Sequence, residues 1–315
     1  MKNKKIIIAG GSGFLGRSLA KYWSPDNQII ILSREPHINA GAISYQQWDG
    51  KTLGTWTAAL EGADLLVNLS GKSVNCRYNE ANKQAIFDSR TFSTQVLGQA
   101  VLQAVNPPKV WINAASATIY RHAEDHPMDE FNGEFKNDFS VQVCKKWEQS
   151  FNELQLPQTR KVIFRIGISL GSEPGGVMHA YCNLIKFGLG GKQGSGQQKY
   201  TWVHTEDVAG MMAWVAETPS LDGVFNCTSP NPVNNQIFMA TLRKATGHLL
   251  GLPAAKWMLT IGAAIIGTET ELLLKSRWVV PTRALQCGYK FRYPLLEPAL
   301  RNIISEMPRS SYHLF

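Results

Sequence analysis

Lys5-Ile6-Ile7-Ile8-Ala9-Gly10-Gly11-Ser12-Gly13-Phe14-Leu15-Gly16 is the stretch that decides the fold. A run of isoleucines ends abruptly in glycines, and apolar residues then recur at helical spacing at Leu15, Leu19 and Tyr22. This order predicts a strand, a tight turn and a helix, with the backbone able to approach a phosphate at the helix N-terminus. A second apolar run at 28–32 follows where the next parallel strand of a β-α-β unit belongs.

The end of that second strand indicates which dinucleotide the turn would hold. A carboxylate there is typical of binding to a free ribose 2′-hydroxyl. The chain has Ser33-Arg34 instead, and a hydroxyl beside a guanidinium suits a 2′-phosphate, so we expect NADP rather than NAD. The alternative is a solvated Arg34 paired with Glu35. The expected dinucleotide contacts in these two segments are Gly10, Ser12, Gly13, Phe14, Leu15, Gly16, Ser33 and Arg34.

Composition narrows the class of partner. The 315 residues carry a net charge of +8, but no basic run is interleaved with aromatic residues, so we expect a small polar or anionic substrate and no nucleic acid. The five cysteines include no C-x-x-C pair, and we expect neither disulfides nor a metal site.

The longest apolar stretch, 259–267, is too short to span a bilayer, and no apolar signal region precedes the first strand. A cytoplasmic monomer or homodimer is expected.

Alternating segments predict an α/β fold with a Rossmann-type, doubly wound parallel sheet. Strands are expected at 63–71, 109–115 and 161–168, and helices at 79–105 and 140–154. Beyond the last of these strands the chain becomes glycine-rich and its elements become shorter. We therefore expect an NADP-binding core at 1–170, to which 200–230 return, and a smaller substrate lobe made of 171–199 and 231–315.

Several segments in order along the chain resemble the extended short-chain dehydrogenases/reductases. They are the glycine turn 10–16, the strand ends 68–71 and 115–120, Arg165, and 202–209. The resemblance implies that Leu69, Ser70 and Gly71 lie beside the adenosine and its ribose. It also implies that Ser116 hydrogen-bonds the reacting oxygen.

A narrower resemblance covers nearly the whole chain. The segments that carry it are Ser116-Ala117-Thr118, Cys144-x-x-Trp147-Glu148, the glycine-rich 187–196, and Trp202-Val203-His204. These are similar to an atypical NAD(P)-dependent "epimerase family" subgroup that ends in a C-terminal domain of unknown function. Residues 252–281 and 288–291 resemble that domain.

The chain departs from the superfamily at the catalytic pair. Those enzymes use Tyr-x-x-x-Lys one helical turn apart, in which tyrosinate moves the proton and lysine lowers the tyrosine pKa and holds the nicotinamide ribose. No tyrosine here is followed four residues later by lysine, and Ser140 and Cys144 stand in the two places. Cys144 is therefore expected to contact the cofactor, either as a reactive thiol or as a small buried one.

Two other residue sets compete for the proton-transfer role. Lys145 or Lys146 would have to replace the lysine from a rotated position on the helix. Tyr120 would act as acid or base from the loop side with Ser116 as its partner, or would only pack beside the nicotinamide. Tyr120 and Ser116 are the catalytic candidates we favour.

The substrate side departs from the nucleotide-sugar enzymes as well. Their diphosphate-binding arginine lies four residues before the histidine, and Tyr200 occupies that place here. The candidate substrate contacts are Arg165, Lys199, Trp202 and His204. The alternative for His204 is a structural one, in which it caps the helix that starts at Thr205.

Two functions follow from this pattern. The first is an NADP-dependent oxidoreductase or epimerase-like enzyme acting on an unidentified small polar substrate. The second is a catalytically impaired protein that binds NADPH as a sensor and regulates a partner. The missing Tyr-x-x-x-Lys pair is the argument for the second.

Overall fold

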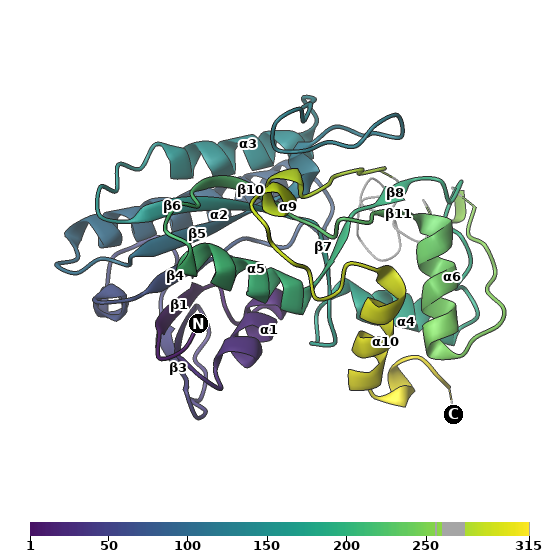
Figure 1. Ribbon diagram of the computed structural model, residues 1–315, viewed down its shortest axis with the longest axis horizontal. Coiled ribbons are helices and arrows are strands. Elements are labelled where there is room, and N and C mark those ends of the chain that lie inside the picture. Colours follow the sequence, from purple (N-terminus) through teal and green to yellow (C-terminus); the bar gives the residue numbers. More distant parts are fainter. Residues whose placement is uncertain (256, 260–274, 315) are drawn as a thin grey trace.

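The computed structural model describes residues 1–255, 257–259 and 275–314. Its centre is a seven-stranded parallel sheet in the order β10-β6-β5-β4-β1-β2-β3 (Figure 1). The strands are β1 (Lys5–Ala9), β2 (Gln28–Ser33), β3 (Ile43–Gln47), β4 (Leu65–Asn68), β5 (Val110–Ser116), β6 (Arg160–Ile166) and β10 (Gly223–Cys227).

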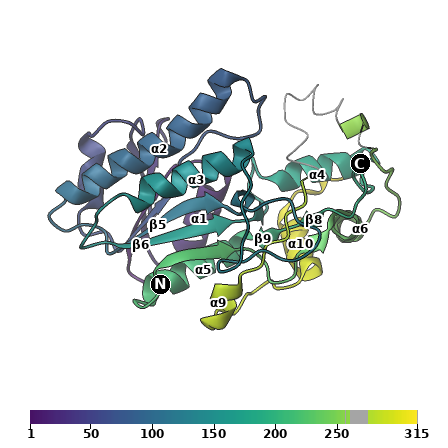
Figure 2. The same cartoon turned by 90° about the horizontal axis from the view of Figure 1, so that it is seen from above.

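Helices cover both faces of the sheet. On one face lie α1 (Phe14–Trp23) and α5 (Thr205–Glu217), and on the other α2 (Glu80–Gln103) and α3 (Phe139–Asn152), which lie side by side in Figure 2. The side chains of β1 alternate accordingly, because Ile6 and Ile8 join the core beneath α1 and α5 while Ile7 joins the core beneath α2 and α3. A central strand buried on both faces reads as a continuous apolar run. The expected Rossmann-type, doubly wound fold is confirmed.

The expected elements match the observed ones closely within the sheet. The helices expected at 79–105 and 140–154 are α2 and α3, and the expected strands at 109–115 and 161–168 are β5 and β6. The strand expected at 63–71 is shorter, since β4 ends at Asn68 and the next residues form the loop at the edge of the sheet. The two edge strands, β3 and β10, were not expected.

A second lobe lies beside the carboxyl ends of the strands (Figure 1). Its core is formed by α4 (Val177–Lys186), α6 (Asn235–Thr246) and α10 (Leu296–Glu306). The connections to the main sheet are two small two-stranded sheets, one antiparallel and one parallel. They are β8 (Lys199–Tyr200) with β11 (Val233–Asn234), and β7 (Ile168–Leu170) with β9 (Trp202–His204).

The remaining described elements are short. They are α9 (Thr282–Gln286), which packs on β10, and the 3-10 helices η1 (Thr55–Leu60), η2 (Ala117–Ile119) and η3 (Arg309–Ser311). Among the helices that the structure describes, none combines the length and apolar character needed to cross a membrane. The apolar stretch at 259–267 lies, apart from Leu259, outside the described residues.

Candidate active site

The glycine turn joins β1 to α1 at the carboxyl edge of the sheet. Gly10 has φ of +72°, and a Cβ there would lie 2.9 Å from Ser70 Cα. A Cβ on Gly16 would lie 2.3 Å from Gly11 Cα, so the helix start and the turn touch through their backbones. Gly13 is the N-cap of α1, and the nearest atom to a Cβ there is 3.6 Å away. The turn thus leaves room beside the N-terminus of α1, where free N–H groups favour an anion.

Ser70 presents an unused polar atom to this turn. Its hydroxyl is buried and has no hydrogen-bond partner among the described residues, and its Oγ lies 3.1 Å from the Cβ position of Gly10. A buried hydroxyl without a partner is unfavourable, so such an atom is suited to meet a bound molecule. Leu69 and Gly71 flank it on the same loop.

The end of β2 is coupled to the turn through hydroxyl groups. Ser33 is buried, its Oγ lies 3.2 Å from Ser12 Oγ, and it accepts a hydrogen bond from Glu35 N at 3.3 Å. Arg34 is exposed. Within the described part of the chain its guanidinium forms no ion pair with Glu35, which was the alternative to phosphate binding.

Sequence reasoning missed Arg17, which braces the turn from α1. Its guanidinium donates to Ser12 O and, at 2.6 Å, to Pro174 O on the loop between β7 and α4. Phe14 packs on the same loop, because a Cβ on Gly176 would lie 2.5 Å from Phe14 Cε2. Leu15 packs against the core beneath α1. The glycine turn is therefore supported by the second lobe as well as by the sheet.

Two cavities adjoin each other where β5 and β6 end, and both are lined by Ser116 and Thr118. The larger, of about 150 Å³, lies toward the second lobe and is also lined by Ile166, Gly167, Ile168, Lys199, Thr201, Lys275 and Arg277. The smaller, of about 110 Å³, lies toward α2 and α3 and is also lined by Tyr78, Arg90, Ser140, Cys144 and Trp147. Ser116 caps η2, accepting from Thr118 N at 3.2 Å, and its Oγ donates to Thr118 Oγ1 at 2.9 Å.

The smaller cavity is lined by Ser140 and Cys144, the residues that stand where the superfamily has tyrosine and lysine. Ser140 and Cys144 are both buried on α3, and burial raises the pKa of the Cys144 thiol to about 12. A thiol with that pKa is protonated at neutral pH, which favours the small buried thiol over the reactive one. The cation in this cavity comes from α2 instead. The Arg90 guanidinium lies 5.0 Å from the centre of the Trp147 ring and 3.0 Å from the Cβ position of Gly71.

Tyr120 lies in a closed polar network rather than in a cavity. It is fully buried, donates to Asn226 Oδ1 at 2.9 Å, and accepts from Arg165 Nη1 at 2.8 Å. Burial raises the pKa of Tyr120. Arg165 also forms a two-pronged ion pair with Glu148, with both N–O distances at 2.8 Å. Tyr120 and Arg165 are therefore hydrogen-bonded to each other, and neither side chain lines the two cavities beside Ser116.

The other substrate candidates divide between the cavity and the core. Lys199 lines the larger cavity. Trp202 is fully buried, and its indole donates to Asn231 O at 3.2 Å. His204 is buried and caps α5, with Nδ1 accepting from Glu206 N at 3.1 Å. The structure therefore shows the capping geometry for His204, which the sequence had offered as the alternative.

Lys275 and Arg277 were also missed, although both line the larger cavity. They stand two residues apart in the sequence, just before Val279-Val280-Pro281. In an extended segment, residues two apart face the same side, and this spacing is the local sign that the sequence offers for the pair.

The glycine turn and the parallel sheet define a dinucleotide-binding protein of the extended short-chain dehydrogenase type. Residues 6–227 match the NAD dependent epimerase/dehydratase family, and residues 254–303 match a domain of unknown function, DUF1731. The chain belongs to the NAD-dependent epimerase/dehydratase family. The family resemblance seen in the sequence is thereby confirmed.

Related proteins extend over almost the whole chain. Human epimerase family protein SDR39U1 is 31% identical over 312 residues, covering 96% of this chain and 100% of that protein. An epimerase family protein of Staphylococcus aureus (strain MRSA252) is 30% identical over 307 residues, with 96% and 100% coverage. A crystal structure of human SDR39U1 (isoform 2) with NADPH has a TM-score of 0.85 at 29% identity, covering 96% of this chain and 99% of that one. A UDP-N-acetylglucosamine 4-epimerase from Methanobrevibacter ruminantium M1 shares the fold at 15% identity, with a TM-score of 0.76 over 97% and 98% of the two chains.

Proposed function

We propose that this protein binds NADPH across the carboxyl edge of the sheet and acts as an oxidoreductase or epimerase-like enzyme on a small polar molecule. The observation that carries the proposal is the glycine turn, where Gly10 lies against Ser70, whose buried hydroxyl has no hydrogen-bond partner in the described part of the chain. A protein of similar sequence, human SDR39U1, has been crystallised with NADPH.

The residues present fit the parts of the dinucleotide in order. The amides of Ser12 and Gly13 at the start of α1 would hold the pyrophosphate, and Arg34 would pair with the 2′-phosphate. Ser70 would donate its hydroxyl to the adenosine end. Arg90 would supply the positive charge beside the nicotinamide ribose that lysine supplies elsewhere in the superfamily, since it lines the same cavity as Cys144, which stands in the place of that lysine.

Ser116 and Thr118 are the hydroxyl groups placed at the reacting end. Their Oγ atoms are hydrogen-bonded to each other and both side chains line the two cavities. When bound, the dinucleotide would supply or accept a hydride. Ser116 would then orient the substrate oxygen by a hydrogen bond, with the Thr118 hydroxyl linked to it. Tyr120 is assigned a positioning role, because its hydroxyl bridges Arg165 and Asn226.

A second candidate function is NADPH sensing without turnover. The burial of Tyr120 and the replacement of the usual pair by Ser140 and Cys144 favour it, because none of these groups offers an acid or base near neutral pH. A protein of this kind would bind NADPH tightly and would bind a partner in one redox state of the nucleotide only.

Titration with NADPH and with NADH tests the dinucleotide assignment. We expect the wild-type protein to bind NADPH more tightly, and Arg34→Ala to weaken NADPH binding about tenfold while leaving NADH unchanged, since a charged hydrogen bond contributes roughly 1.5–3 kcal/mol. Fluorescence of the bound reduced nucleotide gives both constants. Equal affinities of the wild-type protein for NADPH and NADH would contradict the 2′-phosphate role.

Turnover separates the two candidate functions. NADPH oxidation is followed against a panel of small ketones, aldehydes and keto acids, and activity that falls at least tenfold in Ser116→Ala supports the enzyme. Tight NADPH binding with no turnover, together with a partner recovered only with one redox form of the nucleotide, supports the sensor.

A further inference from the structure

The larger cavity beside Ser116 is lined by three cationic side chains. They are Lys199 from β8, and Lys275 and Arg277 from the segment 275–280 of the C-terminal region. No carboxylate occurs among the described residues that line this cavity. A small, partly enclosed space with charge of one sign concentrates ions of the opposite sign.

Backbone hydrogen bonds hold these cations next to each other. Ser276 is fully buried, and its Oγ donates to Ala123 O at 2.7 Å while accepting from Lys199 N at 2.8 Å. Arg277 N donates to Lys199 O at 3.0 Å. Residues 199 and 277 are therefore fixed as neighbours through main-chain atoms, independently of where their side chains point.

The opposite edge of the segment 275–280 is held as firmly. Met128 N donates to Trp278 O at 2.7 Å and Val280 N donates to Met128 O at 3.0 Å. Asn226, the partner of Tyr120, donates to Val280 O at 3.0 Å. A segment tied on both edges presents its cations in a preformed arrangement, so a ligand has less conformational entropy to overcome.

Lys275 and Lys199 differ in their charge partners among the described residues. Lys275 pairs with Asp138 on the N-terminus of α3, with an N–O distance of 2.5 Å. The Lys199 ammonium lies 4.3 Å from the centre of the Trp278 ring, and within the described part of the chain it forms no ion pair. Among the described residues the Lys199 ammonium thus has no carboxylate partner, and an anion bound in the cavity would pair with it.

We propose that this cavity binds an oxyanion group of the substrate, a carboxylate or a phosphoryl group, through Lys199 and Arg277. The proposal rests on the proposed function and adds the class of substrate to it: a small anionic molecule whose reactive carbon lies toward Ser116. It also assigns a role to the C-terminal domain of unknown function, which supplies Arg277 and Lys275 to the substrate site.

Calorimetric titration of the NADPH-saturated protein with inorganic phosphate, and separately with malonate, tests the proposal. We expect binding of at least one probe, and which one binds distinguishes a phosphoryl from a carboxylate site. Lys199→Gln is the main variant, because the hydrogen bonds of residue 199 to the segment come from its backbone. It should raise the dissociation constant about tenfold or more, as should Arg277→Gln.

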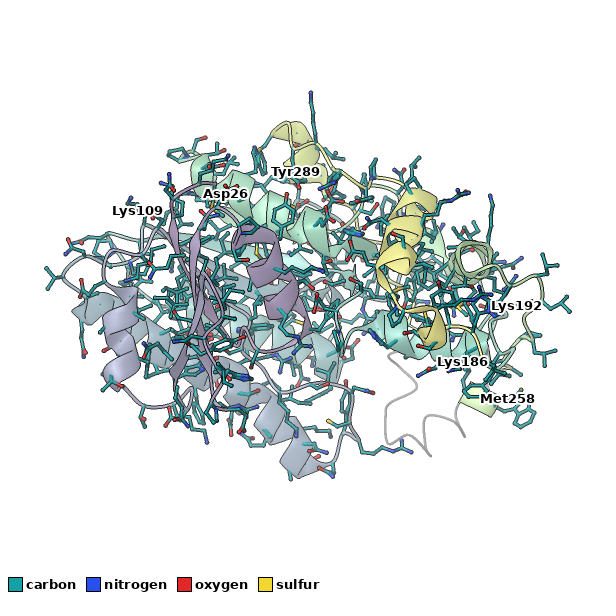
Figure 3. All side chains as sticks on the ribbon, turned by 90° about the horizontal axis from the view of Figure 1, so that it is seen from below. Asp26, Lys109, Lys186, Lys192, Met258 and Tyr289 are labelled. Atoms are coloured by element: carbon teal, nitrogen blue, oxygen red, sulfur yellow. The ribbon has the colours of Figure 1, made fainter. Side chains whose placement is uncertain are left out.

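Lys109→Gln is the matched control. Lys109 precedes β5, at the opposite end of the strand from Ser116, and Figure 3 shows it far from Lys186 and Lys192 of the second lobe. The same charge is removed there, so anion binding should be unchanged. Binding of neither probe by the wild-type protein, or equal affinities of wild type and Lys199→Gln, would overturn the proposal.

The NADPH constants of the same variants keep this proposal distinct from the proposed function. If the wild-type protein does not bind NADPH, the proposed function fails, and titration of the nucleotide-free protein still decides whether Lys199 holds the anion. If Lys199→Gln and Arg277→Gln weaken NADPH binding and leave the probes unaffected, the cations serve the dinucleotide and the substrate proposal is overturned.

Discussion

The imidazole of His204 is enclosed where β9 meets α5. Nδ1 accepts from Glu206 N, and Nε2 lies 3.0 Å from Asn302 Oδ1 of α10. Burial lowers the pKa of His204 to about 4, from the usual value near 6.5. The neutral imidazole is therefore the form that the folded protein holds, joining the sheet to the second lobe.

This lowered pKa makes the folded state sensitive to acid. The unfolded chain takes up a proton near pH 6.5 and the folded chain only near pH 4, so stability is present above pH 6.5 and is lost as the pH falls through that window. His204→Asn keeps a capping side chain but lacks this titrating group. Between pH 7 and 4.5 we therefore expect the free energy of unfolding to fall by roughly 2–3 kcal/mol less in this variant than in wild type. Urea unfolding at several pH values measures the difference.

His37→Asn serves as the control for that series. His37 is an exposed histidine, so the same substitution there measures what the loss of a surface histidine does to the unfolding free energy across the series. Parallel pH curves for wild type and His204→Asn would contradict the burial of a neutral imidazole at this position.

At the level of elements, the strand–turn–helix unit contains two glycines with different constraints. A Cβ on Gly16 would clash with the backbone of Gly11, whereas a Cβ on Gly13 would meet only Gly10 O, at an ordinary contact distance of 3.6 Å, and Gly13 has ordinary backbone angles. A methyl group on Gly16 must displace backbone atoms. A methyl group on Gly13 enters the space proposed for the pyrophosphate.

The two alanine variants should therefore fail in different ways. Gly16→Ala should lower the free energy of unfolding by about 1–3 kcal/mol or more through overpacking. Gly13→Ala should cost no more than about 1 kcal/mol, as for a weak N-cap, but should weaken NADPH binding at least tenfold. Chemical unfolding and nucleotide titration of both variants check this. A stable Gly13→Ala with unchanged NADPH affinity would argue against the proposed cofactor position.

At the scale of the whole molecule, the segment 275–280 joins parts that are far apart in sequence. Ser276 bonds to Ala123 on the loop after β5 and to Lys199 on β8. Asp207 on α5 accepts from Arg292 N at 2.6 Å and from Tyr293 N at 2.9 Å, which anchors the chain before α10. Buried side chains with several partners thus connect the C-terminal region to the core.

Ser276→Ala should loosen that connection. Loss of the hydroxyl leaves Lys199 N and Ala123 O without their partner in a buried place, so the free energy of unfolding should fall by about 1–3 kcal/mol. Hydrogen exchange should become faster at residues 276–280. Ser305→Ala, at an exposed serine, is the control and should change neither quantity.

The core of the fold was predictable because its information is local. The isoleucine run, the glycine turn and the periodicity of α2 and α3 each lie within one short segment, and their boundaries came out within about two residues. The edge strand β3, with the sequence Ile-Ser-Tyr-Gln-Gln, was missed because it is short and partly exposed, so its apolar pattern is weak.

The surroundings of Ser116 and Tyr120 were less predictable because they depend on partners distant in sequence. The hydroxyl of Tyr120 meets Asn226 and Arg165, which lie 106 and 45 positions away, and no local pattern shows that it is buried. Lys275 and Arg277 join Ser116 only because backbone hydrogen bonds place the segment 275–280 beside β8.

Local sequence thus decided the Rossmann-type sheet and the turn suited to a dinucleotide, since strand propensity, glycine conformation and helix start are properties of neighbouring residues. Tertiary packing decided which polar side chains line the cavities beside Ser116. Tyr120, Arg165 and His204 are buried and paired and do not line these cavities, whereas the C-terminal segment adds Lys275 and Arg277 to Lys199 of β8 at the larger one. A side chain's availability is set by what packs around it, and those neighbours come from the whole chain.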